Sequence, residues 1–365
     1  MSYQVANHPG DQNGPEVPRG LAPAAVGAVV VALTLVAGLA WAKWMPYTDK
    51  VGSMLSTHEW DGTAVLDVGG TAPSLSGAWT FLTTYTEAVW PALLVSLLVA
   101  AGIDALLSRR WLQRFLGSGN RWRQAGTGAL ASLPSMMCTC CTAPITVTLR
   151  RAGVPRSAVL SHWLGNPLLN PAVLVFLFLV GPWEWGVTRL LVGLVVVLGA
   201  GVLIGAPADR KAPAVATTDT SPEEMEPPAT LSQLPGRFAR SLWRLSRILV
   251  PEYALVVLLV GAFSGWLSQF AEMSDGLGLF AILVAAAIGA LLVVPTGGEI
   301  PVLVALSAVG AGAGLLGVLL VTLPALSLPS MAMVARVLSV RTTVLTAGAV
   351  VGGGLLAGVL LTILG

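Results

Sequence analysis

Residues 143–153 read Ala-Pro-Ile-Thr-Val-Thr-Leu-Arg-Arg-Ala-Gly, and residues 300–310 read Ile-Pro-Val-Leu-Val-Ala-Leu-Ser-Ala-Val-Gly. A single offset in residue number aligns the two stretches, with proline at the second position and glycine at the last position of each. The same offset continues beyond them, because it also pairs Pro167 with Pro324. Chance does not readily keep one register across both prolines, so the sequence predicts an internal repeat.

The composition around this repeat is that of a membrane protein. Of the 365 residues, 55% are hydrophobic and only 10% are charged, whereas a soluble domain carries roughly a quarter charged residues. The charges gather in short clusters between long apolar runs, as in a bundle of membrane helices. A formal net charge of +2, without a basic stripe interleaved with aromatics, argues against a nucleic-acid partner. We therefore expect an all-α polytopic membrane protein in contact with membrane lipid.

Several apolar runs have about the 20 residues that a helix needs to cross a bilayer. These predicted spans are 21–42, 87–107, 157–181, 187–206, 248–267, 311–332 and 342–364. The first run follows a polar stretch, 1–20, so we interpret it as a retained extra N-terminal helix and not as a cleaved signal peptide. Residues 1–20 are then a disordered cytoplasmic N-terminus, and 21–86 comprise the extra helix and an external loop, 43–86.

The orientation follows from the Lys and Arg residues, which bacterial membrane proteins keep on the cytoplasmic side. They cluster within 109–123, 150–156, 210–247 and 336–341. Because basic clusters flank the broken apolar segment 124–149 at both ends, we expect a re-entrant hairpin split into half-helices by its prolines. One kinked spanning helix is the alternative.

The second half starts after an even number of crossings, so its broken segment, 278–309, enters from outside. The two halves are then inverted repeats, each with a re-entrant or broken-helix hairpin, which is the architecture of secondary transporters. The predicted organisation is a first permease repeat, 87–206, a disordered cytoplasmic linker, 207–241, and a second permease repeat, 242–365. The linker is rich in proline and acidic residues and cannot bury apolar surface.

The tip of the first hairpin carries every cysteine of the chain. It reads Pro-Ser-Met-Met-Cys-Thr-Cys-Cys-Thr-Ala-Pro over residues 134–144. Thiols and thioethers are soft ligands that suit Cu(I) or trivalent arsenic and antimony, and the N-terminus of a half-helix favours the thiolate form. The candidate substrate-binding residues here are Cys138, Thr139, Cys140 and Cys141, with the three cysteines as ligands of a soft metal or metalloid substrate. Alternatively, cysteine and methionine only fill apolar space.

The tip of the second hairpin reads Pro-Thr-Gly-Gly-Glu-Ile-Pro over residues 295–301. Thr296, Gly297 and Gly298 are further candidate substrate-binding residues, since the glycines leave backbone amides exposed. A charge at the bilayer centre costs at least about 2.5 kcal/mol on insertion scales, so Glu299 should face a cavity or be protonated. We expect Glu299 to carry the coupling ion, H+. The alternative is a cap on the half-helix that follows it.

Three polar side chains recur at every fourth residue after the first hairpin. His162, Asn166 and Asn170 therefore share one helical face. The two asparagines are candidate substrate-binding residues, and His162 is a possible pathway residue. The alternative for all three is hydrogen bonding between membrane helices.

Four segments resemble those of the predicted-permease family that includes the organoarsenical efflux permeases. They are 138–144, 165–171, 295–301 and 324–329, and the resemblance extends over roughly 87–364. It implies efflux of a thiophilic solute driven by an ion gradient, and the best-known members export trivalent methylated or aromatic arsenicals. Many relatives have Cys-Ser-Cys-Gly at the first tip, whereas here Cys141 stands in place of the glycine.

The predicted function is a secondary-active inner-membrane permease that exports a trivalent organoarsenical or soft metal ion through a Cys-lined midplane site. The N-terminus is predicted to be cytoplasmic. Neither enzymatic activity nor a cofactor is expected, and no Walker motif suggests ATP hydrolysis; a homo-oligomer is compatible with the sequence. The alternatives are a membrane thiol oxidoreductase and a transporter of a small sulfur or selenium compound. The oxidoreductase would need a cysteine pair that spans both halves, and all three cysteines lie in the first half.

Overall fold

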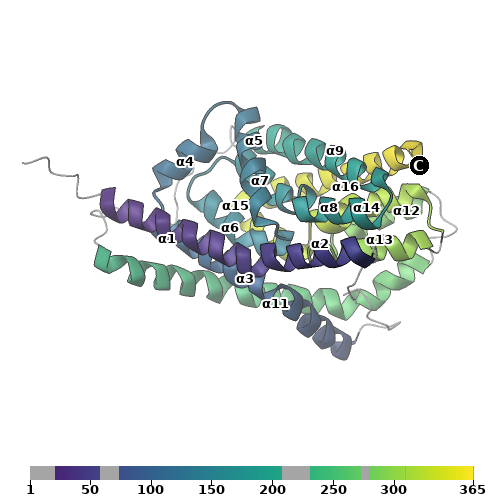
Figure 1. The fold of residues 1–365 in the computed structure, drawn as a ribbon, viewed down its shortest axis with the longest axis horizontal. Helices are drawn as coiled ribbons and strands as arrows, with labels where there is room; N and C mark the ends of the chain where they lie inside the picture. Colours follow the sequence, from purple (N-terminus) through teal and green to yellow (C-terminus); the bar gives the residue numbers. More distant parts are fainter. Residues whose placement is uncertain (1–20, 58–73, 208–230, 273–278, 309, 365) are drawn as a thin grey trace, which may run out of the picture.

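The computed structural model describes residues 21–57, 74–207, 231–272, 279–308 and 310–364, and within these ranges the chain is helical without strands. The first part of the chain contains α1 (Leu21–Leu39), η1 (Ala40–Trp44), α2 (Met45–Thr57), α3 (Leu75–Leu106), α4 (Arg109–Gly117), α5 (Arg121–Ser132), η2 (Leu133–Ser135), α6 (Thr139–Arg151), α7 (Arg156–Leu168), α8 (Pro171–Val180), α9 (Trp183–Gly199) and η3 (Ala200–Gly205). The second part contains η4 (Leu231–Gln233), α11 (Leu234–Glu272), α12 (Leu279–Gly289), α13 (Glu299–Ala308), α14 (Ala313–Ala325), α15 (Leu328–Leu338) and α16 (Val340–Leu364). Figure 1 shows the helices packed into an elongated bundle, with the long helices α1, α3 and α11 running side by side along it.

The helices confirm a multi-pass membrane protein. Within the described residues, six helices are long and apolar enough to cross a membrane. They are Ala25–Ser56, Leu75–Leu106, Arg156–Val180, Trp183–Gly205, Leu234–Ala262 and Val340–Leu364. A seventh candidate is the pair α14 and α15, which bends by 56° at its break. The span predicted for 311–332 is thus broken, because Pro324 and Pro329 each remove a backbone donor near the break.

The external loop predicted for 43–86 is largely helical where the structure describes it. The first span continues through η1 and α2 to Thr57, and α3 starts at Leu75. The Ser74 hydroxyl caps α3 by accepting a hydrogen bond from the Gly77 amide at 3.0 Å. The early turns of α3 mix Ser and Thr with apolar residues, and Phe81 and Tyr85 bury their rings in the core. These turns were predicted to lie in a loop. They are helical because their aromatic side chains pack in the core.

The π-helical segment η1 has a local cause. Pro46 has no amide hydrogen, so it cannot donate to the carbonyl four residues before it. The Met45 amide instead donates to Ala40, five residues back. This wider turn inserts one extra residue into the helix, and such insertions are frequent at functional sites. It changes the directions of Lys43 and Trp44 relative to a regular helix.

The end of the linker predicted for 207–241 is helical. Residues 208–230, like the N-terminal 1–20, lie outside the described residues, but η4 and α11 already begin at Leu231 and Leu234. Pro235 occupies an early position of α11, where its missing amide costs nothing. Leu245 and Ser241 are buried within the bundle, so packing recruits the end of the linker into the helix.

The helix boundaries follow the offset found in the sequence. The difference in residue number between Pro144 and Pro301 also separates the first residues of three helix pairs. These pairs are α7 and α14 at Arg156 and Ala313, α8 and α15 at Pro171 and Leu328, and α9 and α16 at Trp183 and Val340. The recurrence of these boundaries supports the internal repeat.

Caps recur at the same offset. Gly153 and Gly310 both have positive φ, at 86° and 85°, which glycine adopts without steric cost. The amides that follow them close the same kind of cap, from Val154 to Leu149 at 3.1 Å and from Ala311 to Leu306 at 3.0 Å. The two halves thus share backbone detail. Their opposite orientation in a membrane stays a prediction.

The basic clusters gather at one end of the bundle. The Gln113 side chain donates to the Ala152 carbonyl at 3.1 Å, which joins α4 to the end of α6. Arg151 also interacts electrostatically with Arg244 and Arg336. Both ends of the segment from α5 to α6 therefore lie at this end, as a re-entrant hairpin requires, while α12 and α13 lie toward the other end of the bundle (Figure 1). Re-entrance itself stays a prediction.

Close packing of α5 on α7 gives a testable expectation. A Cβ added at Gly128 would lie 2.1 Å from the Ala158 carbonyl oxygen, so we expect Gly128→Ala to lower the melting temperature of the purified protein. The matched control is Gly126→Ala on the same helix, where a Cβ meets nothing within 4 Å. That change should be neutral or stabilising by up to about 1 kcal/mol. Equal melting temperatures of the two variants in detergent would contradict this packing.

Candidate functional site

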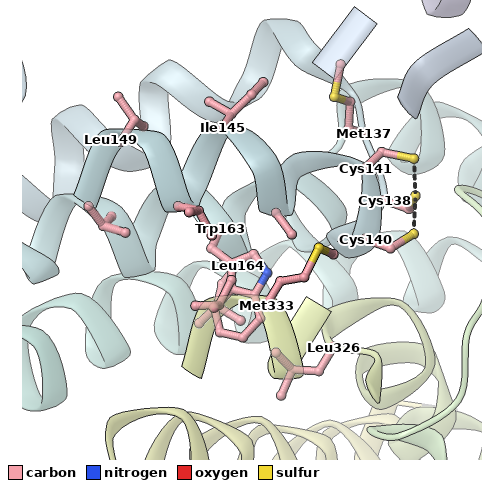
Figure 2. Packing of buried hydrophobic residues seen from close by; sticks show 14 of the residues in the cluster. Met137, Cys138, Cys140, Cys141, Ile145, Leu149, Trp163, Leu164, Leu326 and Met333 are labelled. Atoms are coloured by element: carbon pink, nitrogen blue, oxygen red, sulfur yellow. Dashed lines mark hydrogen bonds between the residues drawn. The ribbon is translucent and has the colours of Figure 1, made fainter. Parts of the chain in front are cut away.

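Three buried thiols meet where the first broken segment resumes as α6. The Cys138 Sγ atom lies 3.1 Å from the Sγ atoms of both Cys140 and Cys141, and all three sulfur atoms are within 4.8 Å of one another. Figure 2 shows Cys138 between the other two, with Met137 close by. None of the three cysteines is in a disulfide. The three cysteines predicted as soft ligands thus lie together, and their role as ligands stays a prediction.

The backbone explains why the thiols converge. Cys138 is extended, with ψ 166°, and directly precedes α6, whereas Cys140 and Cys141 belong to the first turn. Residues next to each other in a helix point in different directions, so the kink at Cys138 brings its side chain toward both neighbours. The first turn of a helix also presents unpaired amides and the positive end of the helix dipole. The cluster therefore lies where negative charge on sulfur is favoured.

An aromatic wall from α3 and α11 borders the thiols. The Tyr85 hydroxyl lies 3.0 Å from the Cys140 Sγ atom. Phe81 stacks on Tyr85 with ring centroids 5.8 Å apart, and the ring of Tyr253 lies 6.3 Å from that of Tyr85. Tyr85 was not among the predicted site residues, because residues 43–86 were expected to form an external loop. The available signal in the sequence was a tyrosine two residues before the predicted span 87–107.

The N-terminal helix holds the tip of the first broken segment. The Trp44 indole donates to the Pro134 carbonyl at 2.8 Å, and the Tyr47 hydroxyl donates to the Met136 carbonyl at 3.4 Å. Met136 has positive φ, 48°, so the chain turns sharply there. The extra helix, which the sequence analysis treated as an addition to the permease repeats, thus contacts the tip directly.

The second tip approaches the same region through Thr296. The Lys43 ammonium donates to the Thr296 hydroxyl at 3.4 Å. Gly297 and Gly298 form the turn that follows; Gly297 has φ 81°, and the Gly298 amide donates to the Pro295 carbonyl at 2.9 Å. Of the three candidates at this tip, Thr296 is linked to the first tip through Lys43 and Tyr47, while the two glycines form the turn of the backbone.

The two halves also meet beside the cysteines. The Thr139 hydroxyl lies 3.1 Å from that of Ser327, which is the N-cap residue of α15. Both are buried. Thr139 therefore joins the first tip to the break between α14 and α15, and the candidate site lies at the interface of the halves.

The three polar residues predicted to share one face of a helix have different surroundings. Asn166 accepts from the Ser135 hydroxyl, which ties α7 to the first tip, and it donates to the His162 carbonyl at 2.8 Å. Asn170 caps α8 by accepting from the Ala172 amide at 3.0 Å. His162 is buried, and neither of its ring nitrogens has a hydrogen-bond partner among the described residues. Of the three, Asn166 is the one that contacts the tip.

Glu299 is paired with an arginine that the sequence analysis did not consider. The Arg189 Nη2 atom lies 3.2 Å from the Glu299 Oε1 atom, and the two side chains are 0% and 1% exposed. Glu299 is also the first residue of α13, but its Oε1 atom is paired with Arg189 and its Oε2 atom has no hydrogen-bond partner among the described residues. The proton-carrying and capping roles both stay predictions. An arginine inside a predicted span was the missed signal.

Arg189 in addition satisfies carbonyls that prolines have released. It donates to Pro167 at 2.8 Å, to Leu168 at 3.1 Å, and to Leu320. The residues four positions after Pro167 and Leu320 are prolines, which have no amide to offer these carbonyls. One guanidinium, with its five donors, thus joins α9 to helix breaks in both halves and to Glu299.

A bundle of apolar spanning helices, with broken helices and buried thiols and charges at its centre, is the architecture of a membrane permease. Sequence comparison identifies the family: the chain belongs to the predicted-permease family, because its residues 74–363 match the ArsP_1 family, described as predicted permease. Members of this family are transporters and not enzymes. The family that the sequence motifs resembled is thereby confirmed.

Two relatives show how far the similarity extends. The chain is 35% identical over 326 residues to the UPF0718 protein YraQ of Escherichia coli (strain K12), which covers 89% of this chain and 92% of the relative. It is 30% identical over 125 residues to the UPF0718 protein YcgR of Bacillus subtilis (strain 168), covering 34% and 41% of the two chains. No solved structure matches the chain.

Proposed function

We propose that this permease exports a small thiophilic solute, a trivalent organoarsenical or a soft metal ion, by binding it at the cluster of Cys138, Cys140 and Cys141. The observation that carries the proposal is the convergence of three buried thiols within 4.8 Å. Structural cysteines do not need to meet in this way, whereas a soft Lewis acid needs two or three sulfur ligands around one centre.

The chemistry of such cargo fits a reversible site. A monoorganyl arsenical, R–As(OH)2, reacts with two thiols to give a dithiolate and two molecules of water, without oxidation or reduction. Release on the other side is the reverse reaction with water or another thiol. Burial of the cluster keeps competing water away, and the Tyr85 hydroxyl can hydrogen-bond to the sulfur of Cys140.

Alternating access would expose this cluster to each side in turn. The broken helices of the two halves meet at Thr139 and Ser327, as in transporters built from inverted repeats. We further propose H+ as the coupling ion and Glu299 as its carrier. The Glu299 Oε2 atom is buried without a hydrogen-bond partner within the described residues, so it can accept a proton when the pair with Arg189 opens. The protein would lie in the inner membrane with a cytoplasmic N-terminus.

Accumulation in a sensitive bacterial host tests the proposal. Cells that express the chain should accumulate less methylarsenite, arsenite or Cu(I) than cells that express a variant with all three cysteines changed to Ser. The expected difference is roughly tenfold or more for the true cargo. Equal membrane levels of both proteins, measured by immunoblot, are the control. Unchanged accumulation of all three compounds would sink the thiophilic-cargo proposal.

The same cells separate the two alternatives. A transporter of a small sulfur or selenium compound would change accumulation of selenite or thiosulfate but not of arsenicals. A thiol oxidoreductase would instead show reversible oxidation of the cluster by a soluble partner. The cluster lies wholly in the first half of the chain, and this favours cargo binding over electron transfer between halves.

A further inference from the structure

We propose that Lys43, on the N-terminal helix, is the counter-ion of the cysteine cluster and determines which thiophilic cargo the site retains. This inference rests on the proposed function. It adds a residue that lies outside the family match, which starts at residue 74. Lys43 is 9% exposed. Burying an ammonium without a charged or hydrogen-bonding partner costs free energy. The groups around Lys43 therefore indicate what its charge interacts with.

The Lys43 ammonium lies between the two tips. Its Nζ atom is 3.2 Å from the Tyr47 hydroxyl and 3.4 Å from the Thr296 hydroxyl, and it sits 5.3 Å from the centre of the Tyr47 ring. The Tyr47 hydroxyl that accepts from Lys43 also donates to the Met136 carbonyl, two residues before Cys138, so the ammonium lies beside the cysteine tip. Within the described part of the chain, no carboxylate forms an ion pair with it. The cysteine cluster is therefore the group whose negative charge Lys43 can balance.

The position of Lys43 is fixed by the helix that carries it. A Cβ added at Gly38 would lie 2.8 Å from Val95 of α3, so α1 and α3 are in close contact. On the other side, the hydrogen bonds of Trp44 and Tyr47 hold the first tip. The extra residue in η1 sets the direction of Lys43 between these anchors. A charge held in this way is preorganised and needs no rearrangement when cargo binds.

A fixed positive charge acts differently on two classes of thiophilic cargo. Silver, as a probe of soft monovalent ions, reacts as Ag+ with two thiols to give an anionic dithiolate and two protons. Phenylarsine oxide, C6H5AsO, reacts with two thiols to give a neutral dithiolate and water. Lys43 attracts the anionic adduct, and this attraction is strong in a poorly solvated site. It has little effect on the neutral adduct.

Binding measurements on the full-length protein in lipid nanodiscs test this role. We expect Lys43→Met to weaken Ag(I) binding by about tenfold or more, while phenylarsine oxide affinity stays within about threefold. Lys43→Arg should restore silver binding, because it keeps the charge. Lys43→Gln keeps a hydrogen-bond donor without the charge and should behave like Lys43→Met. A lysine that only anchors the helix would instead weaken both ligands together.

The outcomes separate this inference from the proposed function. If the triple Ser variant binds both probes as the wild type does, the thiol site itself is wrong. If that variant loses both probes while Lys43→Met and Lys43→Gln leave the ratio of the two affinities unchanged, the role of Lys43 is overturned and the cysteine site stands. A selective loss of silver binding in both neutral variants, with rescue by Lys43→Arg, supports Lys43 as counter-ion.

Discussion

Changing Cys138 to Ser is expected to remove most export of a monoorganyl arsenical, whereas Cys140→Ser and Cys141→Ser should each leave part of it. Cys138 is the central sulfur, 3.1 Å from both of the others. Without Cys140 or Cys141, one closely spaced pair of thiols survives. Without Cys138, only the outer pair is left. Two sulfur ligands on one arsenic centre must be close together, so loss of Cys138 should reduce transport by roughly tenfold or more.

The measurement is uptake of phenylarsine oxide into everted membrane vesicles, where export appears as accumulation inside. Vesicles with Ser at each position in turn are compared at equal protein content. Cys138→Ala serves as a second variant, because it also removes the ligand without introducing a hydroxyl. Equal loss from all three single substitutions would show that cargo needs all three sulfurs. Full activity of Cys138→Ser would contradict the central role of this residue.

Replacing Arg189 by Leu should have the largest effect on stability. It leaves the Glu299 carboxylate buried without its partner, and breaking a buried pair in this way costs about 3–5 kcal/mol. It also removes the donor from the carbonyls of Pro167 and Leu168. We expect much less protein in the membrane and a clearly lower melting temperature in detergent. The double change Arg189→Leu with Glu299→Gln should recover part of the loss.

Size-exclusion chromatography after heating gives the melting temperatures. Arg341→Leu is the matched control, since Arg341 is exposed at the start of α16 and its loss should have little effect. A double variant no better than Arg189→Leu would argue that the carbonyl contacts dominate over the ion pair. The folded Glu299→Gln protein tests coupling separately: if its export still depends on a proton gradient as in the wild type, Glu299 does not carry the proton.

The fold was largely readable because its signals are local. Runs of apolar residues define spanning helices, since each must hydrogen-bond its own backbone within lipid. Prolines and glycines mark the breaks and caps, as at Pro134 and Gly153, because their backbone restrictions act within a few residues. Pro144, which was also predicted to break the first segment, lies inside α6. The same local chemistry produced the cysteine cluster, whose members are neighbours in the chain. Helix ends were less predictable, as the early start of α3 shows, because packing of Phe81 and Tyr85 decided it.

The surroundings of the cluster were decided by tertiary structure alone. Lys43 contacts Thr296, which is 253 residues away in the sequence, and Arg189 contacts Glu299, which is 110 residues away. No periodicity or spacing links residues so far apart. The repeat gives no help either: the positions equivalent to Glu299 and Arg189 are Thr142 and Thr346, which are buried and uncharged. The sequence by itself determined the helices, their breaks and the soft ligands. The counter-charges were set by which helices pack together, because a buried charge is stabilised by whatever partner the fold brings near it.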